Sequence, residues 1–78
     1  MITVHFYAAA RAAAGLAEKK IAVTSVQDVL KQCSSLNSVM NQLIPQCGVL
    51  VDGIACHDYE RLLPPGTRID ILPKFAGG

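Results

Sequence analysis

The chain has 78 residues, with seven Lys or Arg against six Asp or Glu and a formal net charge of +1. A domain of this size buries only about 60% of the surface that its unfolded chain exposes, which argues against a deep catalytic cleft. The balanced charge, without a Lys/Arg cluster or an aromatic stripe, argues against a nucleic-acid partner. No apolar run approaches the roughly 20 residues that span a bilayer, so no membrane span is expected.

The N-terminal residues and the cysteines bear on the compartment. Residues 1–6 lack the basic region and the long apolar segment of a secretory signal, which favours the cytoplasm. Cys33, Cys47 and Cys56 fit neither a paired disulfide framework nor a C-x2-C metal site, so we expect reduced, structural thiols. The two histidines lie far apart in sequence, and no metal site is proposed.

The first quarter of the chain predicts two strands. Residues 2–7 alternate apolar and polar side chains, the pattern of a strand with one face on a core. Residues 8–14 are nearly all alanine, but Gly15 follows after about two turns and isolated helices shorter than ~12 residues are marginal, so we expect a loop with at most a short helical turn. Residues 20–23 alternate again, which predicts a second strand antiparallel to the first.

The middle of the chain has the spacing of a helix. Thr24 or Ser25 is a candidate N-cap, with Gln27 or Asp28 three residues later completing a capping box. The apolar stripe of the main helix follows at Val26, Val29, Leu30 and Cys33. A similar spacing continues at Leu36, Val39, Met40, Leu43 and Ile44. Serine and asparagine between the two stripes lower helix propensity, so a break or a second short helix is expected before Pro45.

The last third of the chain predicts further strands joined by turns. Residues 49–51 are apolar and rich in valine, and they lead into Asp52-Gly53, a pair that suits a type I′ turn. Residues 64–66 are two prolines and a glycine, which predicts another turn.

The final strand is predicted over residues 67–72. Its isoleucines are expected to face the core and Arg68 and Asp70 to face outward, until Pro73 ends the pairing. The resulting order of elements fits an α+β domain with a mixed sheet packed on one main helix, and β-grasp is the simplest such fold. In it, the first and last strands are parallel neighbours in the middle of the sheet, joined by a right-handed crossover. We therefore predict a β-grasp domain over residues 1–73 and a flexible, extended tail over residues 74–78.

The tail ends in Gly77 and Gly78, which suit chemistry at a terminal carboxylate. The segment spans up to roughly 20 Å, at about 3.3 to 3.6 Å per residue, enough to enter another protein's active site. An ionised carboxylate can attack the α-phosphate of ATP, giving an acyl adenylate that a persulfide sulfur displaces. Glycines lack Cβ and let the backbone pass a narrow channel. We expect Gly78 to be the adenylate and thiocarboxylate acceptor.

Three segments of the sequence carry a likeness to a known family: residues 6–15 (FYAAARAAAG), 51–53 (VDG) and 63–78 (LPPGTRIDILPKFAGG). Together they resemble the MoaD/ThiS family of ubiquitin-like sulfur carriers, over nearly the whole chain. The aromatic, alanine, arginine and glycine start is closer to the molybdopterin synthase small subunits of that family than to its thiazole carriers. The family commonly has a second proline and a small aliphatic residue where this sequence has Lys74 and Phe75.

The resemblance implies a function and a set of partners. Gly78 would be adenylated by a ubiquitin-activating-like enzyme that uses ATP, and then thiocarboxylated by a sulfurtransferase. The tail would insert into the large subunit of molybdopterin synthase and donate sulfur to cyclic pyranopterin monophosphate in molybdenum cofactor biosynthesis. Catalytic side chains would belong to the partner, and this chain would bind no cofactor of its own. The expected partner-binding residues are Gly77, Ala76, Phe75, Lys74 and Arg11.

Other functions stay open at the level of sequence. The same carrier chemistry serves thiazole or cysteine biosynthesis. In a ubiquitin-like protein modifier, a lysine amine would capture the activated Gly78 carbonyl in place of sulfur. A plain interaction domain would leave the diglycine without a role. No residue of the chain identifies the sulfur acceptor, so these alternatives stay open.

Overall fold

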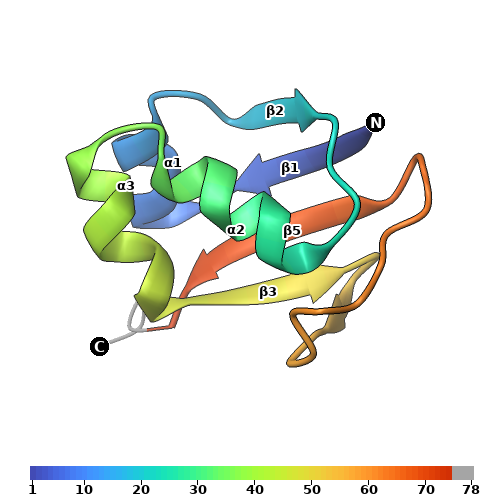
Figure 1. Ribbon diagram of the computed structural model, residues 1–78. Helices are drawn as coiled ribbons and strands as arrows, with labels where there is room; N and C mark the ends of the chain where they lie inside the picture. The colour runs from blue at the N-terminus through green and yellow to red at the C-terminus, as the bar shows by residue number, and fades with distance from the viewer. Residues whose placement is uncertain (75–78) are drawn as a thin grey trace.

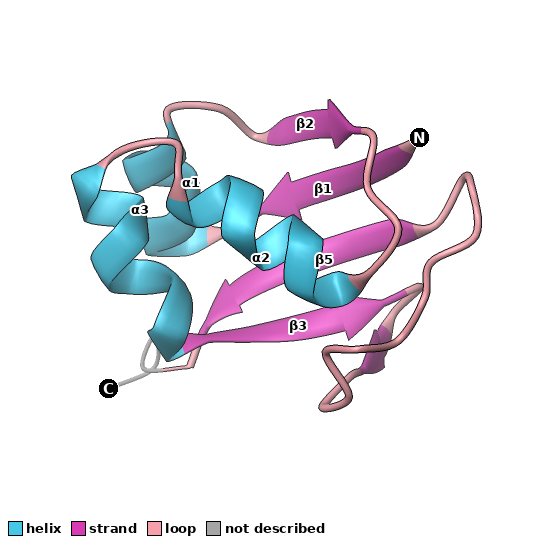
Figure 2. Cartoon of the chain, viewed as in Figure 1, coloured by secondary structure: helices cyan, strands magenta, loops and turns pink. Residues whose placement is uncertain are grey.

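The computed structural model describes residues 1–74 and contains a mixed five-stranded sheet with α2 across one face (Figure 1, Figure 2). The strands are β1 (Ile2–Phe6), β2 (Glu18–Ile21), β3 (Cys47–Val51), β4 (Ile54–Ala55) and β5 (Arg68–Pro73). The helices are α1 (Ala8–Ala14), α2 (Val26–Ser34), α3 (Ser38–Leu43) and the 3₁₀ helix η1 (Ile44–Gln46). Strand order is β2-β1-β5-β3-β4, which confirms the predicted α+β class.

The first and last strands form the centre of the sheet. β1 and β5 are parallel, with Val4 opposite Ile69 and Phe6 opposite Ile71. All other neighbouring strands are antiparallel. Two parallel neighbours require a crossover, and α2 lies within that connection, in front of the sheet (Figure 1). The predicted parallel pairing of the first and last strands in the middle of the sheet is therefore confirmed.

The core lies between this sheet and α2. Alternate residues of β1 are buried, namely Ile2, Val4 and Phe6. The predicted stripe of α2 is buried at Val26, Val29 and Cys33, with Leu30 packed against its margin. Ser25 is the N-cap of α2, and its side chain accepts a hydrogen bond from the N–H of Asp28, as the capping box predicts.

Residues 8–14 correct the expectation of a loop, because they form the helix α1. Gly15 ends it at φ 78°, where its N–H donates to the carbonyl oxygen of Arg11. Ala10 is fully buried, and the helix packs against β5 and α3. A two-turn helix that is marginal alone is thus stabilised by tertiary contacts.

Strand β2 begins earlier than the alternation suggested. It covers Glu18–Ile21 and not residues 20–23, because Phe6 donates to the carbonyl oxygen of Ala17 and Ile2 pairs with Ile21. Its first three residues are exposed, so an edge strand paired on one side shows little alternation of polarity.

The second stripe forms a separate helix, α3, one of the two outcomes left open. Asn37 caps it by accepting the N–H of Met40 at 2.8 Å. Asparagine at this position thus starts a helix, since its side chain replaces a missing backbone partner. The predicted apolar stripe is wrong at one position, because Val39 is 58% exposed. Met40, Leu43 and Ile44 are buried, as predicted.

The turns and the last strand largely follow the sequence. Asp52 and Gly53 take φ 49° and 85°, the positive angles of the predicted turn. The isoleucines of β5 are buried and Pro73 is its last residue. Asp70 lies on the opposite face of β5, as expected, but it is only 7% exposed, because neighbouring polar side chains cover it. No helix within residues 1–74 is long and apolar enough to cross a membrane.

Candidate functional site

The end of the sheet where β5 finishes gathers several elements. Because β1 and β5 are parallel, α1 starts where β1 ends, at the same end of the sheet at which Pro73 closes β5. One further backbone bond follows, since the N–H of Lys74 donates to the carbonyl oxygen of Gln46 at 3.0 Å. Lys74 is exposed and is the last described residue. We call this end of the domain, with Lys74, α1 and η1, the exit pole.

Four of the predicted site residues, Phe75, Ala76, Gly77 and Gly78, lie outside the described residues. The expectations for them, including a flexible tail and a carboxylate acceptor, stay predictions. What the structure adds is the place from which the chain continues, beside η1 and β3 at the exit pole.

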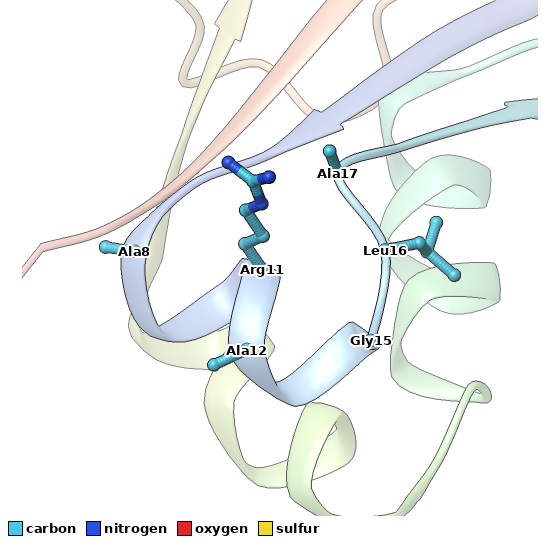
Figure 3. Close-up of a pocket in the computed structure, with 6 residues that line it drawn as sticks. All are labelled: Ala8, Arg11, Ala12, Gly15, Leu16 and Ala17. Carbon is cyan, nitrogen blue, oxygen red and sulfur yellow. The ribbon is translucent and has the colours of Figure 1, made fainter.

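Arg11 lies at this pole in an open hollow formed around α1. The hollow is lined by Ala8, Arg11, Ala12, Gly15, Leu16 and Ala17 (Figure 3). Arg11 projects from the helix into it, with Leu16 and Ala17 opposite (Figure 3). Arg11 is exposed, and within residues 1–74 it forms no salt bridge or side-chain hydrogen bond. Small neighbours, and a guanidinium that no described residue engages, suit a carboxylate from another molecule.

A polar cluster missed by the sequence analysis lies on the face of the sheet opposite α2. Arg68 Nε donates to Asp70 Oδ1 at 2.9 Å, and Arg68 Nη2 donates to the Tyr7 hydroxyl at 2.6 Å. The hydroxyl of Tyr7 in turn donates to Asp70 Oδ1 at 3.3 Å. The hydrogen bond to Asp70, followed by the bond to Tyr7, raises the pKa of Arg68 above its usual value. The parallel register of β1 and β5, invisible in either strand alone, brings these residues together.

Tyr7 connects this cluster to the exit pole. Its N–H donates to the carbonyl oxygen of Ile71, and its own carbonyl oxygen accepts the N–H groups of Ala10 and Arg11. The next residue, Ala8, has φ 51°, an unusual angle for a residue with a Cβ. The cluster therefore stabilises the connection between β1 and α1, the helix that carries Arg11.

The three cysteine thiols are poorly suited to carry a transferred sulfur atom. All three are free and buried, as predicted. Burial, followed by the neighbouring Cys47 thiol, raises the pKa of Cys33 to about 11. Burial also raises the pKa of Cys47, against the opposing effect of Lys74. Thiols with raised pKa are poor nucleophiles because the thiolate is the reactive form.

The adjacent pair Cys56-His57 does not form a catalytic dyad. The thiol of Cys56 is buried and donates to the carbonyl oxygen of Asp58 at 3.4 Å, while His57 is exposed. Within residues 1–74 no group of three or more His, Cys, Asp or Glu could hold a metal ion. The exit pole, with the exposed side chains of Arg11 and Lys74, is therefore the candidate functional site within the described residues.

Comparisons with known proteins agree with the fold. No family model and no curated protein matches the sequence. Among solved structures, SAMP1 from Haloferax volcanii matches with a TM-score of 0.82 and 17% identity, over 99% of this chain and 98% of that one. A chain in the complex of subunits 1 and 2 of molybdopterin-converting factor from Helicobacter pylori matches with a TM-score of 0.78 and 14% identity, over 99% and 97%.

A third solved structure, assigned as subunit 1 of a molybdopterin-converting factor from Pyrococcus furiosus, matches with a TM-score of 0.74 and 16% identity, over 92% of this chain and 94% of that one. At such identities the likeness establishes the fold. The chain therefore has the β-grasp fold shared by SAMP1 and these molybdopterin-converting factor chains.

Proposed function

We propose that this protein is a sulfur carrier whose Gly78 carboxylate is adenylated, converted to a thiocarboxylate, and used as the sulfur donor for molybdopterin. In this proposal it is the small subunit of molybdopterin synthase, and cyclic pyranopterin monophosphate is the acceptor. The reaction takes place in the cytoplasm, where reduced cysteines such as the three free thiols of this chain are usual.

The observation that carries the proposal is the shared fold. This chain covers 94–98% of the three solved structures reported above, two of which bear the name of molybdopterin-converting factor. The sequence adds Ala-Gly-Gly at residues 76–78, one residue beyond Lys74, which follows β5. Fold and sequence together favour a carrier, and within residues 1–74 no group of three or more His, Cys, Asp or Glu could hold a metal ion for catalysis.

The chemistry at Gly78 needs three exchanges of bonds. The carboxylate oxygen attacks the α-phosphorus of ATP and pyrophosphate leaves, which gives an acyl adenylate. A persulfide sulfur on a sulfurtransferase then attacks the acyl carbon and AMP leaves. A second thiol reduces the resulting acyl disulfide, so that a disulfide is released and the thiocarboxylate remains on Gly78. None of these steps uses a side chain of the carrier.

The role of the described residues is then to bind partners. Arg11 and Lys74 lie at the exit pole and are exposed, so their charges are available to an adenylating enzyme or to the large synthase subunit. The partner residues that would contact Phe75, Ala76 and Gly77 as the tail enters supply the remaining recognition. The carrier acts as a co-substrate of its partner enzymes.

Intact-mass spectrometry tests the proposal directly. The full chain is incubated with its adenylating enzyme, ATP, a sulfurtransferase and a sulfur source. We expect a mass gain equal to one exchange of oxygen for sulfur, lost on deletion of Gly78 although the melting temperature is unchanged. Lys20→Glu, on the strand farthest from β3, serves as a control that keeps the mass gain.

Three results would contradict the proposal. With an adenylating enzyme shown to be active, an unchanged mass would exclude the carrier chemistry. A normal mass gain without molybdopterin formation on mixing with the large subunit would redirect the sulfur to thiazole or cysteine biosynthesis. Gly77-Gly78 remnants on lysines of other proteins would instead identify a protein modifier.

A further inference from the structure

The hydrogen bonds between β3 and β5 determine which backbone groups of β3 point outward. Beyond one end of the strand pair, Lys74 donates to the carbonyl oxygen of Gln46 at 3.0 Å. Beyond the other end, Asp52 donates to the carbonyl oxygen of Arg68 at 2.9 Å. Since bonding alternates along an antiparallel pair, the even-numbered residues of β3 face β5. The odd-numbered residues therefore direct their N–H and C=O groups away from it.

This outward edge is covered over only part of its length. β4 pairs with the last two residues of β3, and beyond it Cys56 donates to the carbonyl oxygen of Val49 at 2.9 Å. The N–H of Cys47 is bonded to Ile44 of η1. Within residues 1–74, the N–H of Val49 and the C=O of Cys47 have no hydrogen-bond partner. One donor and one acceptor, two residues apart, are the pair that an added strand engages.

A hollow of about 90 Å³ adjoins this edge and is lined by Gly48, Ala55, His57, Leu72 and Lys74, among others. A Cβ placed on Gly48 would lie 3.7 Å from the carbonyl oxygen of Leu72 and 3.8 Å from Cε of Lys74. The hollow is thus open because residue 48 has no side chain. It is far smaller than the roughly 300–1,000 Å³ of small-molecule sites, and its size suits one short aliphatic side chain.

Charge and position distinguish this edge from the other edge of the sheet. Lys74 is the one formally charged residue that lines the hollow when histidine is neutral. It also directly precedes the tail residues. At the opposite edge, β2 exposes Glu18, Lys19 and Lys20, charges that discourage strand pairing, and β1 separates it from β5. These differences favour the β3 edge over the β2 edge as the contact for a partner that receives the tail.

We propose that the outer edge of β3, from Cys47 to Val49, binds an extended segment of the large synthase subunit by strand addition. A small aliphatic residue of that segment fills the hollow beside Gly48, and an acidic residue lies against Lys74. Main-chain bonds supply the affinity and the hollow supplies the selectivity, as in other strand additions. The inference rests on the proposed function and deepens it, because an added strand here fixes the register of the tail relative to the partner.

Backbone exchange in the complex provides the test. The full chain, labelled with ¹⁵N, is mixed with the purified large subunit, and hydrogen exchange is followed at each amide. The Val49 amide should slow by at least about tenfold on binding, as expected for a new hydrogen bond. The Lys20 amide on the β2 edge should not change.

Matched variants test the same surface by affinity. Gly48→Leu should fill the hollow and weaken binding by at least about tenfold, and Lys74→Glu should weaken it several-fold, while Lys20→Glu stays within about twofold. Gly48→Ala, which meets only ordinary contacts, controls for folding.

The outcomes separate this inference from the proposed function. Tight binding with an unprotected Val49 amide overturns strand addition, even if a variant at Gly48 fails to fold, while thiocarboxylate formation in the same preparation keeps the carrier function. Absence of any binding together with an unchanged mass at Gly78 overturns both.

Discussion

The two ends of β5 are held in different ways. At its start, Arg68 donates its N–H to Asp52 Oδ1 at 2.9 Å, and the Thr67 hydroxyl donates to the carbonyl oxygen of Pro64 at 2.6 Å. Gly66 adds a bond to the carbonyl oxygen of Met1 at 2.9 Å. After its end, a single backbone bond joins Lys74 to Gln46 in the described chain. The strand thus starts in a network of turns and ends beside a single backbone bond. Residues that stabilise the fold are therefore separated along β5 from those to which we assign a role in transfer.

The largest expected effect comes from the middle of the strand. Ile69→Ala empties a fully buried position between β1 and β3 and should reduce the free energy of unfolding by about 2–5 kcal/mol in urea denaturation. Lys74→Ala, on an exposed side chain, should stay within about 0.5 kcal/mol of the unsubstituted protein. A comparable loss in the Lys74 variant would remove the distinction between β5 and the residue that follows it.

The next effect is the pH dependence of stability that arises from the buried thiols. One of them, Cys47, pairs with Pro73 at the C-terminal end of β5. Burial raises the pKa of Cys33 from 9.0 to about 11. Because the folded pKa is the higher one, the stability that the neutral thiol contributes is complete below pH 9.0 and is lost as the pH rises through about 11. The loss across this window should be at most about 2–3 kcal/mol.

Chemical denaturation at several pH values checks this effect. Cys33→Val, which keeps an apolar side chain of similar size, should flatten the decline between pH 9 and 11 relative to the parent protein. An equally steep decline in both proteins would assign it to other groups. Slow reaction of the Cys33 thiol with a thiol reagent at neutral pH would agree with its burial.

Replacing the turn glycines near the start of β5 should lower the free energy of unfolding less than a core substitution does. It should lower it more than a substitution at the exit pole does. Gly66 and Gly53 have φ 89° and 85°, so replacement by alanine should cost about 1–2 kcal/mol in each case. Gly48→Ala is the matched control, because that glycine has no positive φ and its added Cβ would meet only ordinary contacts. Equal losses at all three positions in thermal unfolding would contradict the backbone explanation.

Sequence patterns located most of this fold because the patterns and the contacts coincide. Val4 alternates with polar neighbours, Ser25 caps a stripe of buried residues, and Asp52-Gly53 turns with positive φ. The helix α1 was missed because burial of Ala10 depends on β5, far along the chain.

The polar cluster was missed for the same reason. Asp70 follows the outward pattern of its strand, and only the pairing of β5 with β1 reveals that Tyr7 covers it. The exit pole could be predicted as the end of β5. The hydrogen-bonding edge of β3 could not, because it depends on the length of β4.

The smallest expected effect tests whether the cluster supports the exit pole. Tyr7→Phe removes the hydroxyl that accepts from Arg68 and donates to Asp70, but it leaves the direct bond between Arg68 and Asp70 in place. The loss should be about 1 kcal/mol, because Arg68 and Asp70 keep each other as partners and water can replace the exposed bond. Because the backbone of Tyr7 accepts the amides of Ala10 and Arg11, those two amides should exchange faster in the variant. Tyr59→Phe is the control, since within residues 1–74 the Tyr59 hydroxyl has no hydrogen bond in the structure. Equal hydrogen exchange of the α1 amides in both variants would show that backbone hydrogen bonds alone stabilise the connection between β1 and α1. The position of Arg11 would then not depend on the polar cluster around Asp70.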